Sequence, residues 1–200
     1  MNAVVRVTFP AWLATRSRKG RLVGAAVALA AAVSCSRGGV FGKFIGTVKT
    51  EWTDPDRKMT LLADFQYVDP SGKSWMAPKG SIIDGASIPR ILWTAVGSPF
   101  TGSYRNASVV HDVACDKRDR PWQDVHLMFY NACRCGGVGE TEAKLLYAGV
   151  YHFGPRWSTN GMRIAYKRTT PEDQDLAQLK TFIETKNPSL QEIQTFQPQR

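Results

Sequence analysis

The sequence predicts an α+β fold, with a small antiparallel β region followed by a three-helix half. Between Met59 and Ala77, two short runs rich in aromatic and aliphatic residues flank a turn-forming segment, which is typical of a hairpin. From Tyr104 to Phe153, apolar residues instead recur at helical spacing. The 200 residues are 43% hydrophobic and include six Trp, which is enough for one globular core.

The N-terminal segment has the layout of an export signal. A cluster of basic residues precedes the apolar run Leu22 to Val33, and it comprises Arg16, Arg18, Lys19 and Arg21. Twelve apolar residues are fewer than the roughly 20 that a membrane-spanning helix needs, whereas they suit a secretory signal. A buried Ala-rich helix is the alternative interpretation.

The residues after the apolar run resemble a bacterial lipoprotein cleavage box. They are Ala32, Val33, Ser34 and Cys35, and in such a box Cys35 becomes the lipid-bearing residue. We therefore expect residues 1–37 to be an export segment. The protein is then expected in the cell envelope, either membrane-anchored through Cys35 or periplasmic or secreted, where membrane lipid is a candidate partner.

The remaining chain divides into a domain and an extension. A Gly-rich stretch from Gly38 to Gly46 leads into a single α+β domain over residues 38–157. Residues 158–200 are more polar and are expected to be an extension with one amphipathic helix over 171–186. The net charge is +9, but no basic motif is interleaved with aromatic residues, so we expect no nucleic-acid partner.

The elements of the domain are expected in a definite order. The hairpin turns at Asp69-Pro70-Ser71-Gly72, and Ile82 to Gly85 forms a strand end that enters a tight turn. Asp84 or Ser87 would cap a short helix over 89–96. Three longer helices are then expected over 104–115, 121–133 and 140–153, the last of them stopped by Gly154 and Pro155.

The three cysteines that follow Cys35 suggest a disulfide in an oxidising compartment. They are Cys115, Cys133 and Cys135, and Cys115 is expected to pair with one of the other two. Cys133 and Cys135 are too close in sequence to form a zinc site by themselves.

His111 and Asp112 are the first candidates for chemistry. Neighbouring residues on a helix point about 100° apart, so the two side chains can do different jobs in one site. A neutral imidazole can take a proton from water, and a carboxylate can bind a hard cation. A packed His beside a surface Asp is the alternative.

Asp124 and Asp84 extend this candidate site. The short connection between the first two helices makes them antiparallel neighbours, so Asp124 is expected to approach His111 and to fix its tautomer. Asp84 at the turn is a second candidate oxygen ligand for a metal, or a cap. We expect His126 and His152 to be structural or exposed.

A family resemblance rests on several of these residues. They are Pro78-Lys79-Gly80, the block DGASIPRILW from Asp84 to Trp93, Gly97-Ser98-Pro99, His111-Asp112, Asp124, and the ending from Phe153 to Trp157. With these, the span from Met59 to Trp157 resembles the bacterial and phage proteins of the domain of unknown function 1353 family. That family implies no activity.

The order of the same residues is also similar to that in small secreted bacterial phospholipases A2. This resemblance implies that His111 is the base, that Asp84 and Asp112 bind calcium, and that Asp124 orients the His. Three function classes stay open: a calcium-assisted hydrolase of lipid esters, a non-catalytic envelope or phage-related protein, and a hydrolase of another exported substrate such as the cell wall.

Overall fold

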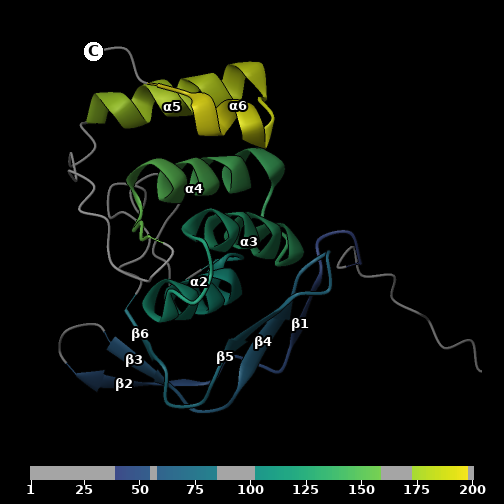
Figure 1. Cartoon of the computed structure of the whole chain (residues 1–200), viewed down its shortest axis with the longest axis vertical. Helices are drawn as coiled ribbons and strands as arrows, with labels where there is room; N and C mark the ends of the chain where they lie inside the picture. Colours follow the sequence, from purple (N-terminus) through teal and green to yellow (C-terminus); the bar gives the residue numbers. More distant parts are fainter. Residues whose placement is uncertain (1–38, 55–57, 85–101, 159–172, 198–200) are drawn as a thin grey trace, which may run out of the picture. The chain divides into compact units, whose positions relative to one another are not determined.

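A computed structural model describes residues 39–54, 58–84, 102–158 and 173–197 of the chain (Figure 1). Several predictions fall outside these ranges. They are the export segment over 1–37 with its Cys35, the short helix over 89–96, and the DGASIPRILW block beyond its first residue, Asp84.

The described chain contains two three-stranded sheets, and every strand pair in them is antiparallel. One sheet has the order β1-β4-β5, with β1 Lys43–Ile45, β4 Phe65–Val68 and β5 Ser74–Ala77. The other has the order β2-β3-β6, with β2 Thr50–Asp54, β3 Lys58–Leu61 and β6 Ile82–Ile83. The predicted antiparallel β region is therefore confirmed.

The predicted turn joins β4 to β5. Oδ1 of Asp69 accepts hydrogen bonds from the backbone N–H groups of Ser71 at 2.9 Å and Lys73 at 3.0 Å. Gly72 has a φ of +84°, a conformation that other residues rarely adopt. Oδ2 of Asp69 also accepts a hydrogen bond from the indole of Trp75 at 3.0 Å, which ties the turn to the strand that follows.

Five helices lie in the described residues. The first three are α2 Arg105–Lys117, α3 Trp122–Cys135 and α4 Glu140–Phe153, within two residues of the predicted bounds. Helix α5 Asp173–Lys186 was also expected, whereas α6 Leu190–Thr195 was not. Ser189 and Glu192 form a capping box at the start of α6. This motif is visible in the sequence, but the six-residue helix that follows is too short to give a clear helical pattern.

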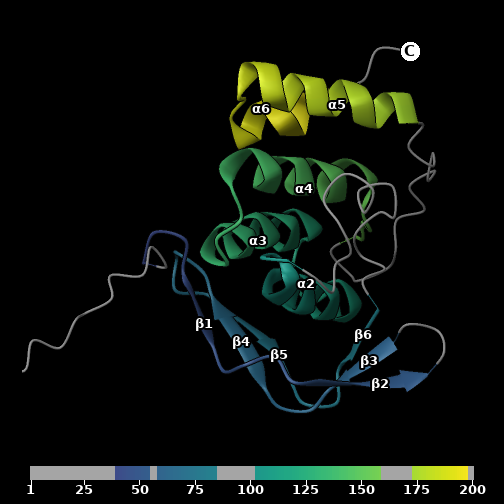
Figure 2. The ribbon, with the colours of Figure 1, turned by 180° about the vertical axis from the view of Figure 1, so that it is seen from behind.

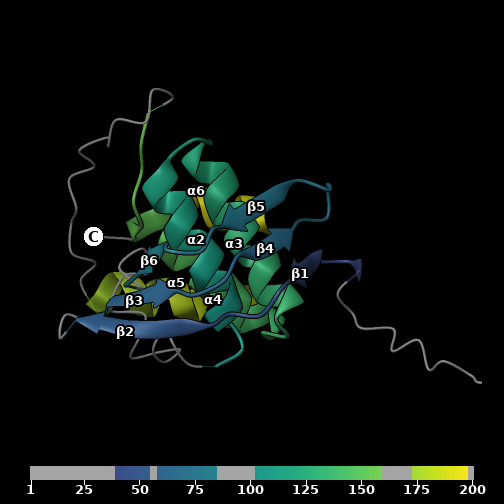
Figure 3. The same ribbon diagram turned by 90° about the horizontal axis from the view of Figure 1, so that it is seen from below.

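The helices stack outward from the sheets in chain order. Helix α2 contacts β4, β5 and β6, α3 packs on α2, and α4 packs on α3 (Figures 1 and 2). Seen from the sheet side, the strands cross in front of α2 and α3 (Figure 3). Because α2 is covered by sheets on one side and by α3 on the other, residues 107–115 are all buried.

The C-terminal helices belong to this packed structure. Both α5 and α6 contact α4, and Leu176, Leu179, Ile183 and Ile193 are buried in the hydrophobic core. Lys144 of α4 is 5% exposed, and its ammonium reaches Glu140 at 2.7 Å and Asn187 at 2.7 Å. Residues 173–197 are thus a packed layer on α4, not the polar extension that composition suggested.

Across the described ranges, we find no helix with the length and apolar character needed to cross a membrane.

Candidate functional site

His111 lies in the middle of α2 and faces α3. Its side chain is fully buried, and its ring packs 4.5 Å, centroid to centroid, from the ring of Phe129 on α3. A histidine in such a place must satisfy its ring nitrogens inside the protein, because burying an unpaired polar group is costly. The partner of its Nε2 therefore determines what His111 can do.

That partner is His126 of α3. Nε2 of His111 lies 2.9 Å from Nδ1 of His126, and Nε2 of His126 lies 3.1 Å from the carbonyl oxygen of Pro155. A carbonyl only accepts, so Nε2 of His126 donates and its Nδ1, in a neutral ring, accepts. Without a metal, His111 must then donate from Nε2, which leaves the lone pair on its Nδ1.

Burial keeps both rings neutral. It lowers the pKa of His111 well below the usual value of 6.5, and the neighbouring His126 ring lowers it further. The pKa of His126 is lowered to about 3, mainly by burial, with a contribution from Arg156 and against the opposing effect of the Pro155 carbonyl. Neutral imidazoles are the form of histidine that binds metal ions.

A thiol completes a three-residue cluster. Cys115 lies one helical turn after His111, and its Sγ is 3.6 Å from Nε2 of His111. One ligand atom from each of His111, Cys115 and His126 lies within 4.8 Å of the other two. This is the only group of three metal-ligating side chains within the parts of the chain that the structure describes.

The spacing within the cluster can be compared with a tetrahedral zinc site. Zinc bonds of about 2.0–2.1 Å to nitrogen and 2.3 Å to sulfur imply separations of about 3.6 Å between N and S and about 3.4 Å between two nitrogens. The N–S distance of 3.6 Å fits, whereas the N–N distance of 2.9 Å is that of a hydrogen bond. Binding zinc would need the two rings to separate by about 0.5 Å.

The two predicted calcium ligands lie on different elements. Asp112 follows His111 in α2 and is 3% exposed, and Asp84 directly follows β6, which packs against α2. Neither belongs to the three-residue cluster. Calcium takes six to eight oxygen ligands, so two carboxylates would form only part of such a site.

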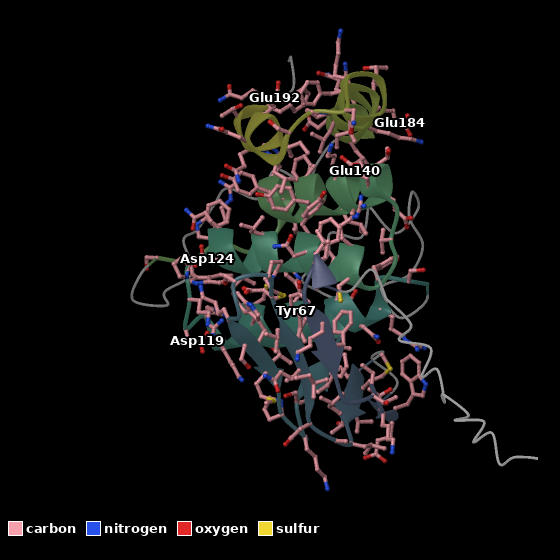
Figure 4. All side chains as sticks on the ribbon, turned by 90° about the vertical axis from the view of Figure 1, so that its right-hand side faces the viewer. Tyr67, Asp119, Asp124, Glu140, Glu184 and Glu192 are labelled. Atoms are coloured by element: carbon pink, nitrogen blue, oxygen red, sulfur yellow. The ribbon has the colours of Figure 1, made fainter. Side chains whose placement is uncertain are left out.

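Asp124 is not brought to His111. Its Oδ2 pairs with the ammonium of Lys73 at 3.2 Å, and no hydrogen bond joins it to His111. Figure 4 shows Asp124 at the periphery of the domain. The physical reason is helical geometry: Asp124 and His126 are two residues apart and so point about 200° apart, and the face toward α2 carries His126.

The disulfide expected for Cys115 is not formed. Cys133 and Cys135 are free thiols, and Cys115 is bonded to neither. Because α2 and α3 are antiparallel, Cys115 near the end of α2 faces the start of α3. Cys133, near the other end of α3, instead approaches Tyr104, whose pKa it helps to raise.

Two of the three clustered residues are thus not predicted as site residues from sequence patterns. The sequence indicates a disulfide for Cys115 and a structural or exposed position for His126. The available signal was the spacing of four between His111 and Cys115, which puts both on one helix face. No spacing rule relates His126 to them, because its approach depends on how α2 and α3 pack.

Comparisons with known proteins show which family the middle part of the chain resembles. Residues 59–150 match the family described as "Protein of unknown function (DUF1353)", which confirms the resemblance expected from the sequence. These matches do not support the similarity to phospholipases A2.

Two relatives come from Sinorhizobium fredii (strain NBRC 101917 / NGR234). "Uncharacterized protein y4jT" is 38% identical over 141 residues, which are 69% of this chain and 42% of that protein. "Uncharacterized protein y4iH" is 46% identical over 97 residues, which are 48% of this chain and 41% of that protein. The chain thus matches about two fifths of the length of each relative, and no solved structure matches it.

Proposed function

Since the chain carries a DUF1353 domain over residues 59–150, a family without an assigned activity, we propose that the domain binds a soft divalent metal ion such as zinc. The ligands are Nε2 of His111, Sγ of Cys115 and Nδ1 of His126. The convergence of one ligand atom from each of these three side chains within 4.8 Å, from two helices, is the observation that carries the proposal.

The surroundings of His126 support this role. A histidine that binds a metal through one nitrogen usually donates its other N–H to a carboxylate or a backbone carbonyl, which fixes the tautomer. His126 has this arrangement, because its Nε2 donates to Pro155 while its Nδ1 faces the cluster. One thiolate and two imidazoles are also a ligand set that suits zinc better than calcium.

Burial of the cluster favours a structural role for the ion. His111 and His126 are fully buried and Cys115 is 3% exposed. A metal at this place ties α2 to α3 at the centre of the helical layers, and its binding free energy adds to the stability of the fold. Three protein ligands leave one tetrahedral position, which a buried water molecule would complete.

Zinc titration of the metal-free protein tests the proposal. Zinc should raise the free energy of unfolding, by about 2.7 kcal/mol when its free concentration is 100 times the Kd. Cys115→Ser should remove most of this gain, because a hydroxyl is a poor ligand for zinc. Cys135→Ser is the matched control, since this half-buried thiol lies outside the cluster.

The outcome for the two cysteine variants decides the matter. A zinc-induced gain in unfolding free energy that persists in Cys115→Ser and disappears in Cys135→Ser would show that zinc binds Cys135 and not Cys115. No gain in the parent protein at any zinc concentration would remove the proposal.

A calcium-assisted hydrolase of lipid esters is the second candidate. It is favoured by the tautomer of the metal-free site, in which Nδ1 of His111 keeps a lone pair, and by the adjacent Asp112. In this candidate His126, in place of Asp124, orients the base, and Asp84 and Asp112 hold calcium. The low pKa of His111 weakens it as a base, which is why we rank this candidate second.

Calcium separates the two candidates. The hydrolase requires that calcium raise the melting temperature and that Asp112→Asn abolish this rise. It also requires that the protein release fatty acid from phospholipid. The metal centre requires that zinc raise the melting temperature and that calcium leave it unchanged.

We also propose that residues 1–37 direct export. Fractionation of cells that carry the parent chain or Cys35→Ala tests this.

A further inference from the structure

A cavity lies between the second sheet and the first turns of α2. Its volume is about 200 Å³, and its walls come from β2, β3, β6 and α2. Across the sheet, Trp52 pairs with Met59, and Met59 pairs with Ile83, so the three side chains form one row. Val109 and Ser108 of α2 form part of the opposite wall.

The cavity has an apolar interior and an exposed rim. Ile83 is 1% exposed and Val109 is 4% exposed, so the inner walls are closed by core side chains. Trp52, in contrast, is 65% exposed although it lines the same cavity. An indole held at the mouth of an apolar cavity offers a large contact area to a ligand that enters from solvent.

The mouth also carries a positive charge. Arg105 lines the cavity and is exposed, and in the described part of the chain no ion pair involves it. It is the first residue of α2, and no acidic residue is present in the first turn of that helix. A cation at the positive end of a helix dipole is unfavourable by itself, and an anion bound there would relieve it.

We propose that this cavity binds a single-chain anionic amphiphile. The aliphatic chain lies along the row of Trp52, Met59 and Ile83, and the carboxylate or phosphate head pairs with Arg105. The cavity is smaller than the 300–1,000 Å³ usual for drug-sized ligands, so it holds only part of a chain. None of the three clustered residues lines the cavity, so the amphiphile site is independent of the metal centre.

Calorimetric titration with two probes tests this site on the full chain. Decanoate below its micelle concentration is the free amphiphile, and phosphatidylcholine vesicles that contain lysophosphatidylglycerol present a single-chain anionic amphiphile on a membrane. Decyltrimethylammonium, with an equal chain and the opposite charge, should not bind. Arg105→Gln should weaken binding of the anionic probe about tenfold, as expected for loss of one charge-assisted contact.

Two further variants make the test specific. Trp52→Ala should also weaken binding, and because Trp52 is exposed this variant should keep its fold. Lys79→Gln removes an equal charge from an exposed residue outside the cavity and should bind like the parent chain.

The pattern of binding then decides the proposal. Binding in either arm that is about tenfold weaker in Arg105→Gln supports the site, and the arm in which it occurs identifies the source of the ligand. Absence of binding in both arms, or equal binding by the parent chain and Arg105→Gln, overturns it.

Discussion

His126 links two elements of the helical core through its two ring nitrogens. It contacts His111 on α2 and the carbonyl of Pro155 after α4, and its ring also packs near Trp122 and Trp157. His126→Ala leaves a cavity and removes the partner of two buried polar groups. We expect the metal-free protein to lose about 3–5 kcal/mol of unfolding free energy, measured by urea denaturation with a chelator present.

Asp124 serves as the control for His126 in the urea denaturation experiment, because its side chain pairs with Lys73 at the surface. Its ion pair with Lys73 is about half exposed on both sides, and such pairs contribute about 0–1 kcal/mol. Asp124→Asn should therefore change the unfolding free energy by less than about 1 kcal/mol. A larger loss in Asp124→Asn than in His126→Ala would contradict the arrangement of α3 described above.

The two buried imidazoles also predict how stability depends on pH in the metal-free protein. In the unfolded chain both histidines take up protons as the pH falls through about 6.5. In the folded chain burial keeps them neutral, and His126 resists protonation down to a pKa of about 3. Stability is therefore complete above pH 6.5 and falls as the pH drops toward 3.

The number of protons that the unfolded chain binds in excess of the folded chain sets how steeply the unfolding free energy falls with pH. Each histidine contributes a slope of up to about 1.4 kcal/mol per pH unit within that window. Urea denaturation at several pH values, on the parent protein and on His126→Gln, measures it. A parent protein whose stability is unchanged between pH 7 and pH 5 would contradict the burial of these rings.

The candidate site could be predicted only in part from single residues. A His beside a carboxylate in a helix is a local pattern, and it indicates His111. The tendency of carboxylates to orient histidines favours Asp124, but the packing face of α3 carries His126 instead. Contacts between residues far apart in sequence determine which face of a helix packs against its neighbour. A single sequence does not show these contacts.

Strand β5 is an edge strand whose open side is covered by the α2–α3 connection. Nη2 of Arg120 donates to the carbonyl of Ser74 at 2.8 Å, and Nζ of Lys117 donates to that of Met76 at 3.0 Å. The guanidinium of Arg120 also lies 4.2 Å from the ring centre of Trp75. Long basic side chains thus occupy the backbone groups that another strand would otherwise bind.

Removing this cover should expose the edge. Arg120→Ala is expected to lower the unfolding free energy by about 1–2 kcal/mol and to increase self-association, since an open edge pairs with other chains. Light scattering against protein concentration measures the association. Lys79→Ala, an exposed cation elsewhere on the β half, is the control and should stay monodisperse; equal behaviour of the two variants would contradict the role of Arg120.

The elements themselves were largely predictable, for physical reasons that are local. The Asp69–Gly72 turn follows from an Asx turn and a glycine with positive φ, and helix α4 has the predicted bounds because Gly154 and Pro155 follow it. The short strands β1, β2 and β3 were not individually predicted. They have three to five residues each, and so few residues give no clear alternation pattern.

Helices α5 and α6 form a layer on α4 and are expected to contribute to the stability of the whole domain. The polar composition of this segment does not predict that packing. Four buried side chains of α5 and α6 lie in the core, and each contributes about 1.5–3 kcal/mol when fully buried. Their sum is comparable to the total stability of a typical domain, about 5–15 kcal/mol. A chain ended after Ser158 should therefore fail to fold cooperatively.

Circular dichroism melting of the two chain lengths measures this effect. The full chain should show one sigmoidal transition, whereas the chain ended after Ser158 should show none or one at much lower temperature. Equal transitions would mean that residues 173–197 contribute little to the stability of the fold.

The metal centre is the central claim, and cobalt(II) tests it most directly because its spectrum reports the ligands. We expect one cobalt ion per chain, visible bands typical of tetrahedral coordination, and a near-ultraviolet band from the thiolate–cobalt bond. Cys115→Ser should lose the thiolate band, and Cys135→Ser should keep it. A parent protein without the band, or a band that survives in Cys115→Ser and disappears in Cys135→Ser, would contradict the assignment of His111, Cys115 and His126 as a metal site.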